Sequence, residues 1–528
     1  MKYLFKKLAW RLPLAVVVLS FVLMTCQDDK KRTGEHDPNL PVLAYSFQPD
    51  SGRIRDQFLI NGKNFGNDKS IVKVFFNEID EALVIGCSDE QMLVLVPRTT
   101  EGRVEVSVQV GNQPKQILPI QFKYKSSRQV STVTGSGENI NDFDHGLLDR
   151  GKLNPVYIGI DQNENIFVTV GEAPGPDGST IYDRLVLINE EENSIRTLLT
   201  RDQGFTHRCP PNVHPVSNWV MLGHESVRDR FLLLDPKSNW APTLCFIKNW
   251  NVSGNPDNPD AVGQWDGMGR MTEPGTPPQS KFSEPISTDC QHYSLLYCEY
   301  DGYYYTRYGR ANNNGQIVRI DPNTWNAEVI GMTPPGATYG MAFNTWRDPS
   351  DPDDLDKSRT WEMWMAYAGD DGASALVMNS LCTLDIRDRK TWQEANGDVS
   401  NPLGGQGDVY YGIMSSFKRV TSDQGRGHRD GLIAQAQFAG PRQISFDNSG
   451  ICYVGDSYNH CIRKIDTRTG IVSNYVGIPG VNTPFSDGNE KDATFREVHG
   501  IVSIVTATDY LIYASDWGNR RIRKIAEE

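Results

Sequence analysis

The chain has 528 residues, of which 38% are hydrophobic and 23% are charged, and its net charge is −13. This length exceeds what one hydrophobic core supports, so two or three domains are expected. The negative charge excludes a typical nucleic-acid-binding protein, which needs a broad basic face for the phosphate backbone. Apolar and polar residues alternate along much of the chain between Gly, Asp, Asn and Pro residues. This pattern predicts an all-β protein.

The N-terminus carries a targeting signal. Basic residues in the first eleven positions precede a short apolar run at 14–24, and Cys26 follows. An apolar run of this length predicts a signal segment rather than a membrane span. Leu23 to Cys26 resembles the cleavage box of bacterial lipoproteins, with Thr25 in place of the usual Gly, Ala or Ser. The resemblance implies a signal peptide at 1–26, a lipid on Cys26 and a flexible linker at 27–38.

The residues after Cys26 refine the expected location. Gln27, Asp28 and Asp29 resemble the acidic signal that sends lipoproteins of the Bacteroidetes to the outer face of the outer membrane. Two or more acyl chains hold such a protein stably, because each buried methylene contributes about 0.8 kcal/mol. The expected contact with the membrane is the lipid alone. The alternative is a plain secretory leader with an incidental cysteine.

Residues 39–125 contain a compact set of strand signals. The segment Ile60-Asn61-Gly62-Lys63-Asn64-Phe65-Gly66 follows one apolar stretch, and 104–108 alternates Val with polar residues. Alternation of this kind buries one face of each strand and leaves the other in water. The segment at 60–66, with the Val96-Pro97 pair, resembles the IPT/TIG family of immunoglobulin-like sandwiches. The resemblance implies a spacer or docking module without chemistry of its own.

The C-terminal third repeats itself. Phe438 to Ile444 is echoed by Phe495 to Ile501, and Cys452 to Ile465 is echoed by Ile512 to Ile525. A spacing near sixty residues with four strand signals in each unit is typical of propeller blades. Asp456 and Asp516 recur in the turn between strands. Their repetition favours an architectural role, in which the carboxylate accepts backbone N–H bonds.

These repeats resemble NHL repeats, and weaker copies bring the number of units to six. The weaker copies lie near 157–168, 230–235, 303–321 and 361–385. The resemblance implies a six-bladed NHL β-propeller over 128–528, after the IPT/TIG sandwich. Val130 to Gly137 looks like the outer strand of a unit but precedes the first full blade, and the last unit stops after its third strand. We therefore expect the early strand to complete the last blade, which removes open sheet edges.

Eight further cysteines leave the redox state open. Their number is even and the expected compartment is oxidising, so disulfides are one possibility. Cys452 and Cys461 flank a predicted hairpin turn and would face each other across it. The alternative is buried free thiols, because a protein of this size needs no covalent staples.

Candidate ligand-binding residues lie where the inner strands begin, because propellers bind ligands at the mouth of the central channel. By alignment of the repeats, Arg442 and His499 hold equivalent positions there, and Tyr339 is placed as a third. A ring of Arg, His and Tyr suits an anion, a sugar or a metal. A metal would need several converging imidazoles, and we predict neither a metal nor another cofactor.

Aromatic side chains in turns add to this set. Trp517 and Tyr458 fall in turns and are expected to be exposed, where flat rings with polar rims suit the faces of sugars. His428 completes the predicted ligand-binding residues. For each of these side chains the alternative is an ordinary role in blade packing or on the surface.

Three functions remain open from the residues alone. The first, which the lipoprotein leader and the resemblances favour, is a surface protein that binds an extracellular ligand, above all a glycan, for polysaccharide capture and uptake, with outer-membrane transport proteins as partners. The second is a metal-dependent lyase or hydrolase with its site in the propeller channel. The third is a protein-interaction scaffold. No nucleophile, phosphate-loop or zinc-protease motif is present, so no catalytic residue is predicted.

Overall fold

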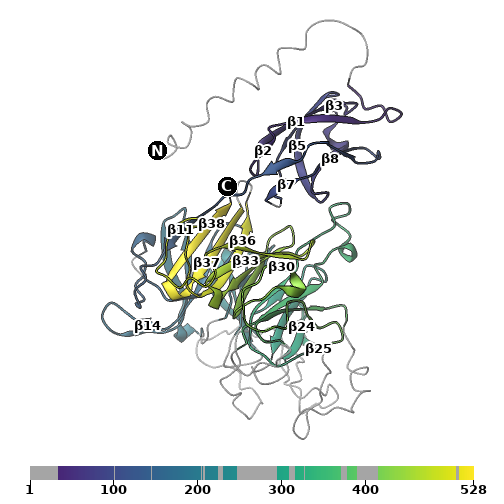
Figure 1. Cartoon of the computed structure of the whole chain (residues 1–528). Coiled ribbons are helices and arrows are strands. Elements are labelled where there is room, and N and C mark those ends of the chain that lie inside the picture. The colour runs from purple at the N-terminus through teal and green to yellow at the C-terminus, as the bar shows by residue number, and fades with distance from the viewer. Residues whose placement is uncertain are drawn as a thin grey trace. The chain divides into compact units, whose positions relative to one another are not determined.

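The structure is a computed structural model, and it divides the chain into two compact units, 1–126 and 127–528. It describes residues 34–99, 101–143, 146–203, 205, 209–223, 230–246, 294–308, 315–325, 327–369, 377–388, 414–506 and 510–527. Cys26 and the whole predicted signal segment lie outside these ranges. The described residues are almost entirely strands and turns (Figure 1). None of their helices is both long and apolar enough to cross a bilayer.

The N-terminal unit is a sandwich of two sheets. One sheet has the order β1-β3-β6-β5-β4-β8-β9 and the other β2-β10-β7. The strands are β1 Leu43–Gln48, β2 Ser51–Gly52, β3 Gln57–Lys63, β4 Val72–Phe76, β5 Asp80–Cys87, β6 Gln91–Leu95, β7 Gly102–Val104, β8 Val106–Val110, β9 Gln116–Ile117 and β10 Phe122–Tyr124. Strand alternation sends Phe58, Phe76 and Phe122 into one core, where their rings meet at 5.1–5.5 Å. The expected immunoglobulin-like sandwich is confirmed.

Within its described residues, the C-terminal unit contains six sheets of four or five strands and one two-stranded ribbon. The first three sheets are β12 Pro155–Ile160, β13 Ile166–Val170, β16 Arg184–Asn189 and β17 Ser194–Leu199; β18 Asn212–Val213, β19 Val220–Gly223, β20 Arg230–Asp235 and β21 Ala241–Phe246; and β22 Leu296–Tyr297, β23 Tyr304–Tyr308, β24 Gly315–Ile320 and β25 Ala327–Thr333. The ribbon is β14 Ala173–Pro174 with β15 Thr180–Ile181. Neighbouring strands within each sheet run antiparallel, as short alternating strands joined by tight turns require.

The last three sheets include the two strongest sequence repeats. They are β26 Thr338–Phe343, β27 Glu362–Tyr367, β28 Ser380–Asp385 and β29 Lys418–Arg419; β30 Gly431–Leu432, β34 Ile471–Val476, β33 Cys461–Asp466, β32 Ile451–Asp456 and β31 Pro441–Phe446; and β35 Gly488–Asn489, β11 Arg128–Thr134, β38 Arg521–Glu527, β37 Tyr510–Asp516 and β36 Val498–Val505. Eight three-residue 3-10 helices, η1 Lys69–Ile71, η2 Leu148–Arg150, η3 Arg201–Gln203, η4 Pro236–Ser238, η5 Leu355–Lys357, η6 Ile433–Gln435, η7 Ser457–Asn459 and η8 Trp517–Asn519, occupy turns across the described residues.

The six sheets of the C-terminal unit follow one another around a ring. Each of six apolar clusters combines side chains from two neighbouring sheets, and the last cluster joins the first sheet to the sixth. In that last cluster Ile158 and Val168 of the first sheet pack with Tyr513 and Ile522 of the sixth. Burial of apolar side chains between successive sheets therefore stabilises a β-propeller.

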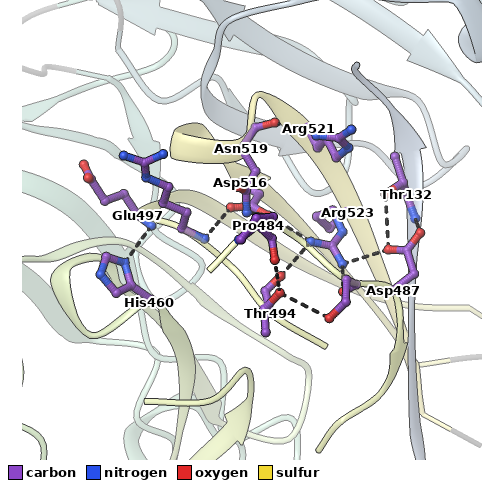
Figure 2. Close-up of polar contacts among 12 residues, drawn as sticks. Thr132, His460, Pro484, Asp487, Thr494, Glu497, Asp516, Asn519, Arg521 and Arg523 are labelled. Carbon is purple, nitrogen blue, oxygen red and sulfur yellow. Dashed lines mark hydrogen bonds and ion pairs between the residues drawn. The ribbon is translucent and has the colours of Figure 1, made fainter. Parts of the chain in front are cut away.

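The N-terminal strand β11 closes the ring, as expected from the sequence. It pairs with β38, the last strand of the chain, and Figure 1 shows the two side by side. In the fifth sheet, the outer strand β34 donates an N–H from Asn474 to Asp430. In the sixth sheet β11 takes the same place, where the N–H of Thr132 donates to Asp487 at 3.1 Å (Figure 2).

The repeated aspartates are architectural. Asp456 is fully buried, accepts the backbone N–H of Ala439 at 2.7 Å and forms an ion pair with Arg463 at 3.0 Å. Burial raises the pKa of Asp456 to about 6, although the nearby Arg463 charge and the hydrogen bond from Asn459 act to lower it. Asp516 and Arg523 repeat this pair in the sixth sheet at 2.8 Å.

The expectation that Cys452 and Cys461 face each other is wrong. In the β32–β33 pairing Cys452 lies opposite Ile465, and Cys461 lies opposite Asp456. Both are free thiols, and burial raises their pKa values. Of the six described cysteines in the propeller unit, five pack in its apolar clusters and Cys461 is buried in β33.

Candidate functional site

Four inner strands share one irregularity at the same end of the propeller channel. The ladder register shifts between Pro155 and Tyr157 in β12 and between Thr338 and Gly340 in β26. It shifts again at 441–444 in β31 and at 498–500 in β36. A bulge leaves one or more residues unpaired and changes the direction of their side chains. The unpaired positions include Tyr339, Arg442 and His499, three of the predicted site residues.

These bulges gather a compact set of side chains, which we call the entrance cluster: Tyr157, Tyr339, Arg442, His499 and Trp517. The Arg442 guanidinium lies over the Tyr339 ring, 4.5 Å from its centre. Tyr157 and Tyr339 are buried in one apolar cluster, and Trp517 packs against it. The His499 and Trp517 rings are stacked at 4.5 Å with an interplanar angle of 8°.

Close contact between the inner strands explains why glycine lies beside the cluster. A Cβ at Gly340 would lie 2.4 Å from the Arg442 carbonyl oxygen, and one at Gly500 would lie 3.0 Å from the backbone of Tyr157. Only glycine fits at such distances without displacing the neighbouring backbone. The approach brings Tyr157, Tyr339 and Arg442 together from three separate strands.

The predicted turn residues Tyr458 and Trp517 are less exposed than expected. Tyr458 is half-buried in η7, and a Cβ on Gly440 would lie 2.5 Å from the Tyr458 ring. The exposed Arg426 covers this ring at 4.4 Å. Trp517 is also half-buried, because it stacks on His499. The expectation that these two rings are freely exposed is therefore wrong.

His428 is not brought into the entrance cluster by any contact of the described residues. Its pKa is lowered, first by burial and then by the charge of Arg463. Its neighbour Gly427 accepts a hydrogen bond from Asn459 at 2.9 Å, which places this segment beside the buried Asp456 and Arg463 pair. The role of His428 as a ligand-binding residue stays a prediction.

A buried glutamine lies between the entrance cluster and the rest of the channel. Gln443 accepts the N–H of Ile158 at 3.1 Å and donates to the Ile158 carbonyl oxygen at 2.6 Å. Its side chain thereby joins β31 to β12 across the channel. Gln443 was not predicted from the sequence, although an inward-facing amide in an inner strand next to Arg442 was a usable signal.

Beyond Gln443 the channel opens into a cavity of about 570 Å³. It is lined by residues from all six inner strands near their C-terminal ends, among them Asn212, Tyr297, Phe343, Ser445 and Ser503. Ser445 and Ser503 bond to each other at 3.0 Å. The channel thus has two candidate binding regions on either side of Gln443, and the predicted residues belong to the entrance cluster.

A metal site in the channel would require several His, Cys, Asp or Glu side chains that converge on one point. Of the histidines considered from the sequence, His145, His207 and His224 lie outside the described residues. His460 accepts the N–H of Glu497 at 3.2 Å (Figure 2). The part of the chain that the structure describes contains no group of three or more His, Cys, Asp or Glu side chains arranged to hold a metal ion.

Comparison with known families identifies the N-terminal unit. Residues 43–125 match the IPT/TIG domain family. A shorter match of 65 residues is 37% identical to NHL repeat-containing protein 2 of Bos taurus and covers 12% of this chain. The chain spans only 9% of the length of that relative.

Solved structures resemble the chain over most of its length. A Bacteroides thetaiotaomicron protein of unknown function is 23% identical with a TM-score of 0.61, and the alignment covers 94% of this chain and 100% of that one. An auxiliary nutrient binding protein from Bacteroides ovatus is 18% identical with a TM-score of 0.47, at the same coverage. The first likeness supports the fold of an IPT/TIG sandwich followed by a β-propeller.

Proposed function

We propose that this protein is a surface lipoprotein whose propeller binds a glycan at the entrance cluster. The observation that carries the proposal is the shared bulge of successive inner strands, because it directs Tyr339, Arg442 and His499 toward one end of the channel. Bulges are frequent beside functional sites, where they change the aim of a side chain.

The chemistry of the cluster suits a sugar. Trp517 is half-exposed and is held flat by His499, so one aromatic face is pre-oriented for the apolar face of a pyranose ring. The Arg442 guanidinium and nearby tyrosine hydroxyls supply hydrogen-bond donors for sugar oxygens. A pocket that combines aromatic rings with a few convergent polar groups is typical of small-molecule recognition.

The placement of this site in the cell is part of the same proposal. A lipid on Cys26 anchors the chain in the outer membrane, facing the exterior, and the IPT/TIG domain separates the propeller from the anchor as a spacer. Glycan capture there serves uptake by outer-membrane transport partners. The alternative of a metal-dependent lyase or hydrolase stays a prediction, since three of its candidate histidines lie outside the described residues.

A glycan-array screen tests the binding function. We expect the chain expressed from residue 27 to bind at least one glycan class equally with and without chelator. Trp517→Ala should weaken that binding about 10-fold or more, because it removes the stacking face. Trp361→Ala is the matched control, since Trp361 is also half-buried but stacks on Arg387 at 3.6 Å. Chelator-sensitive binding, or equal losses in both variants, would contradict the proposal.

Replacement of the anchor cysteine tests the location. Cys26→Ala should abolish incorporation of a labelled fatty acid and move the protein from the membrane fraction to the soluble fraction. Protease added to intact cells should cleave the wild-type protein at the surface. An unlabelled mature protein recovered from the periplasm would contradict the lipid anchor.

A further inference from the structure

We infer that the glycan bound at the entrance cluster carries an acidic sugar residue, whose carboxylate or sulfate group pairs with Arg442. This inference rests on the proposed function and narrows its ligand class. It follows from the charge that Arg442 brings to the mouth and from the groups that surround it.

Arg442 differs from four of the arginines that lie over aromatic rings in this propeller, each of which pairs with an aspartate. Arg319 over Tyr303 pairs with Asp301 at 3.0 Å. Other such arginines also have aspartate partners: Arg387 with Asp385, Arg463 with Asp456 and Arg523 with Asp516. Arg442 lies over Tyr339 in the same way, but it forms no ion pair with any carboxylate of the described residues. Its Nε is buried and makes no hydrogen bond within the described ranges.

The groups that do surround Arg442 are neutral. Burial acts to lower its pKa, while Tyr157, Tyr339 and Tyr458 act to raise it, and the pKa is raised overall. Phenol side chains are uncharged at neutral pH. None of these neighbours therefore offers a negative charge with which the guanidinium can pair at neutral pH. An anionic ligand group would supply that partner.

Further cations lie near this mouth. Arg426 covers the Tyr458 ring at 4.4 Å, and the charges of Arg426 and Arg496 both act to lower the pKa of His460. One carboxylate, that of Glu497, acts on His460 in the opposite direction. A local excess of arginine in a chain with a net charge of −13 favours an anion at this position.

An acidic sugar would contact both Arg442 and Trp517 of the entrance cluster. A guanidinium binds a carboxylate or sulfate through two parallel N–H bonds, which are stronger than bonds to neutral oxygens. The ring of the same sugar residue would lie on the aromatic face of Trp517, which is stacked on His499. A neutral sugar would use the ring contact but would leave Arg442 uncompensated.

The test compares matched acidic and neutral ligands by calorimetry with the purified chain. The ligand pairs are an oligogalacturonide with its methyl ester, and a sulfated galactan oligosaccharide with its desulfated form. We expect one acidic member to bind about 10- to 100-fold more tightly than its neutral match. The pair that shows this difference identifies carboxylate or sulfate as the recognised group.

Variants of Arg442 complete the test. Arg442→Gln should abolish the acidic preference, because it lowers the affinity for the acidic member far more than the affinity for its neutral match. Arg442→Lys should restore only part of it, because an ammonium lacks the planar fork. Arg387→Gln, in which another stacked arginine is removed, should leave the preference unchanged. Binding of neutral glycans with no acidic preference overturns this inference alone, whereas failure to bind any glycan overturns the proposed function as well.

Discussion

Val130→Asp is expected to destabilise the propeller by about 4 kcal/mol or more. Val130 lies in β11, is fully buried and packs with Ile512 and Ile525 of the sixth sheet. The substitution would place an unpaired carboxylate among apolar side chains and would detach the strand that closes the ring. The measurement is urea unfolding followed by tryptophan fluorescence, because ten of the eleven tryptophans lie between 219 and 517.

The adjacent residue of the same strand provides the control. Ser131 is exposed and lies opposite Lys524 in the β11–β38 pairing. Ser131→Asp should change the free energy of unfolding by no more than about 0.5 kcal/mol. Equal effects of the two substitutions would show that β11 does not belong to the sixth sheet.

Removal of the Arg523 guanidinium is the second change with a large expected effect. Its side chain is fully buried and donates to Asp516 at 2.8 Å, to Asp487 at 2.7 Å and to the carbonyl oxygens of Thr494 and Ser486 (Figure 2). Arg523→Met would leave the buried Asp516 carboxylate without its counter-charge. We expect a loss of about 3–5 kcal/mol in the free energy of unfolding, measured as above.

A double variant separates the buried charge from the loss of packing. In Asp516→Asn with Arg523→Met the amide oxygen can still accept the N–H of Arg496, which Asp516 accepts at 2.8 Å in the wild type. The double variant should therefore be more stable than Arg523→Met alone. Lys524→Met, which removes an exposed ion pair with Glu190, should cost no more than about 1 kcal/mol. If Arg523→Met costs as little as Lys524→Met, the buried network does not stabilise the closing sheet.

The fold was largely predictable because its signals are local and repeated. The repeats at 438–465 and 495–525 have the same strand lengths and turn residues, so each predicts the other. Val130 to Thr134 has the alternation of an outer strand and the last unit lacks one, which was enough to predict the β11–β38 pairing. Alternation fixes which face of a strand is buried whatever its partner is.

Register and side-chain grouping were less predictable because they depend on contacts between sheets. Cys452 and Cys461 flank one turn, but the hairpin closes at Asp456 and Cys461, so Cys452 lies opposite Ile465. The bulge that displaces Arg442 arises where β31 approaches β26 at Gly340. Neither this register nor this bulge can be predicted from the sequence of the strand in which it occurs. For the same reason Gln443 was not predicted from the sequence.

The repeated elements also separate structure from function in this propeller. Asp456 and Asp516 recur and make equivalent buried contacts, which fits their predicted architectural role. Arg442 and His499 hold equivalent positions but differ in type. Positions that keep their backbone geometry while changing their side chain are those at which a repeat protein can acquire a ligand site without altering its blades.

A crystal structure of the chain with a glycan selected on the array would locate the ligand. We expect a sugar ring on the face of Trp517 opposite His499 and a ligand oxygen within hydrogen-bond distance of Arg442. A sugar in the cavity beside Ser445 and Ser503, on the other side of Gln443, or on the IPT/TIG domain would contradict this expectation.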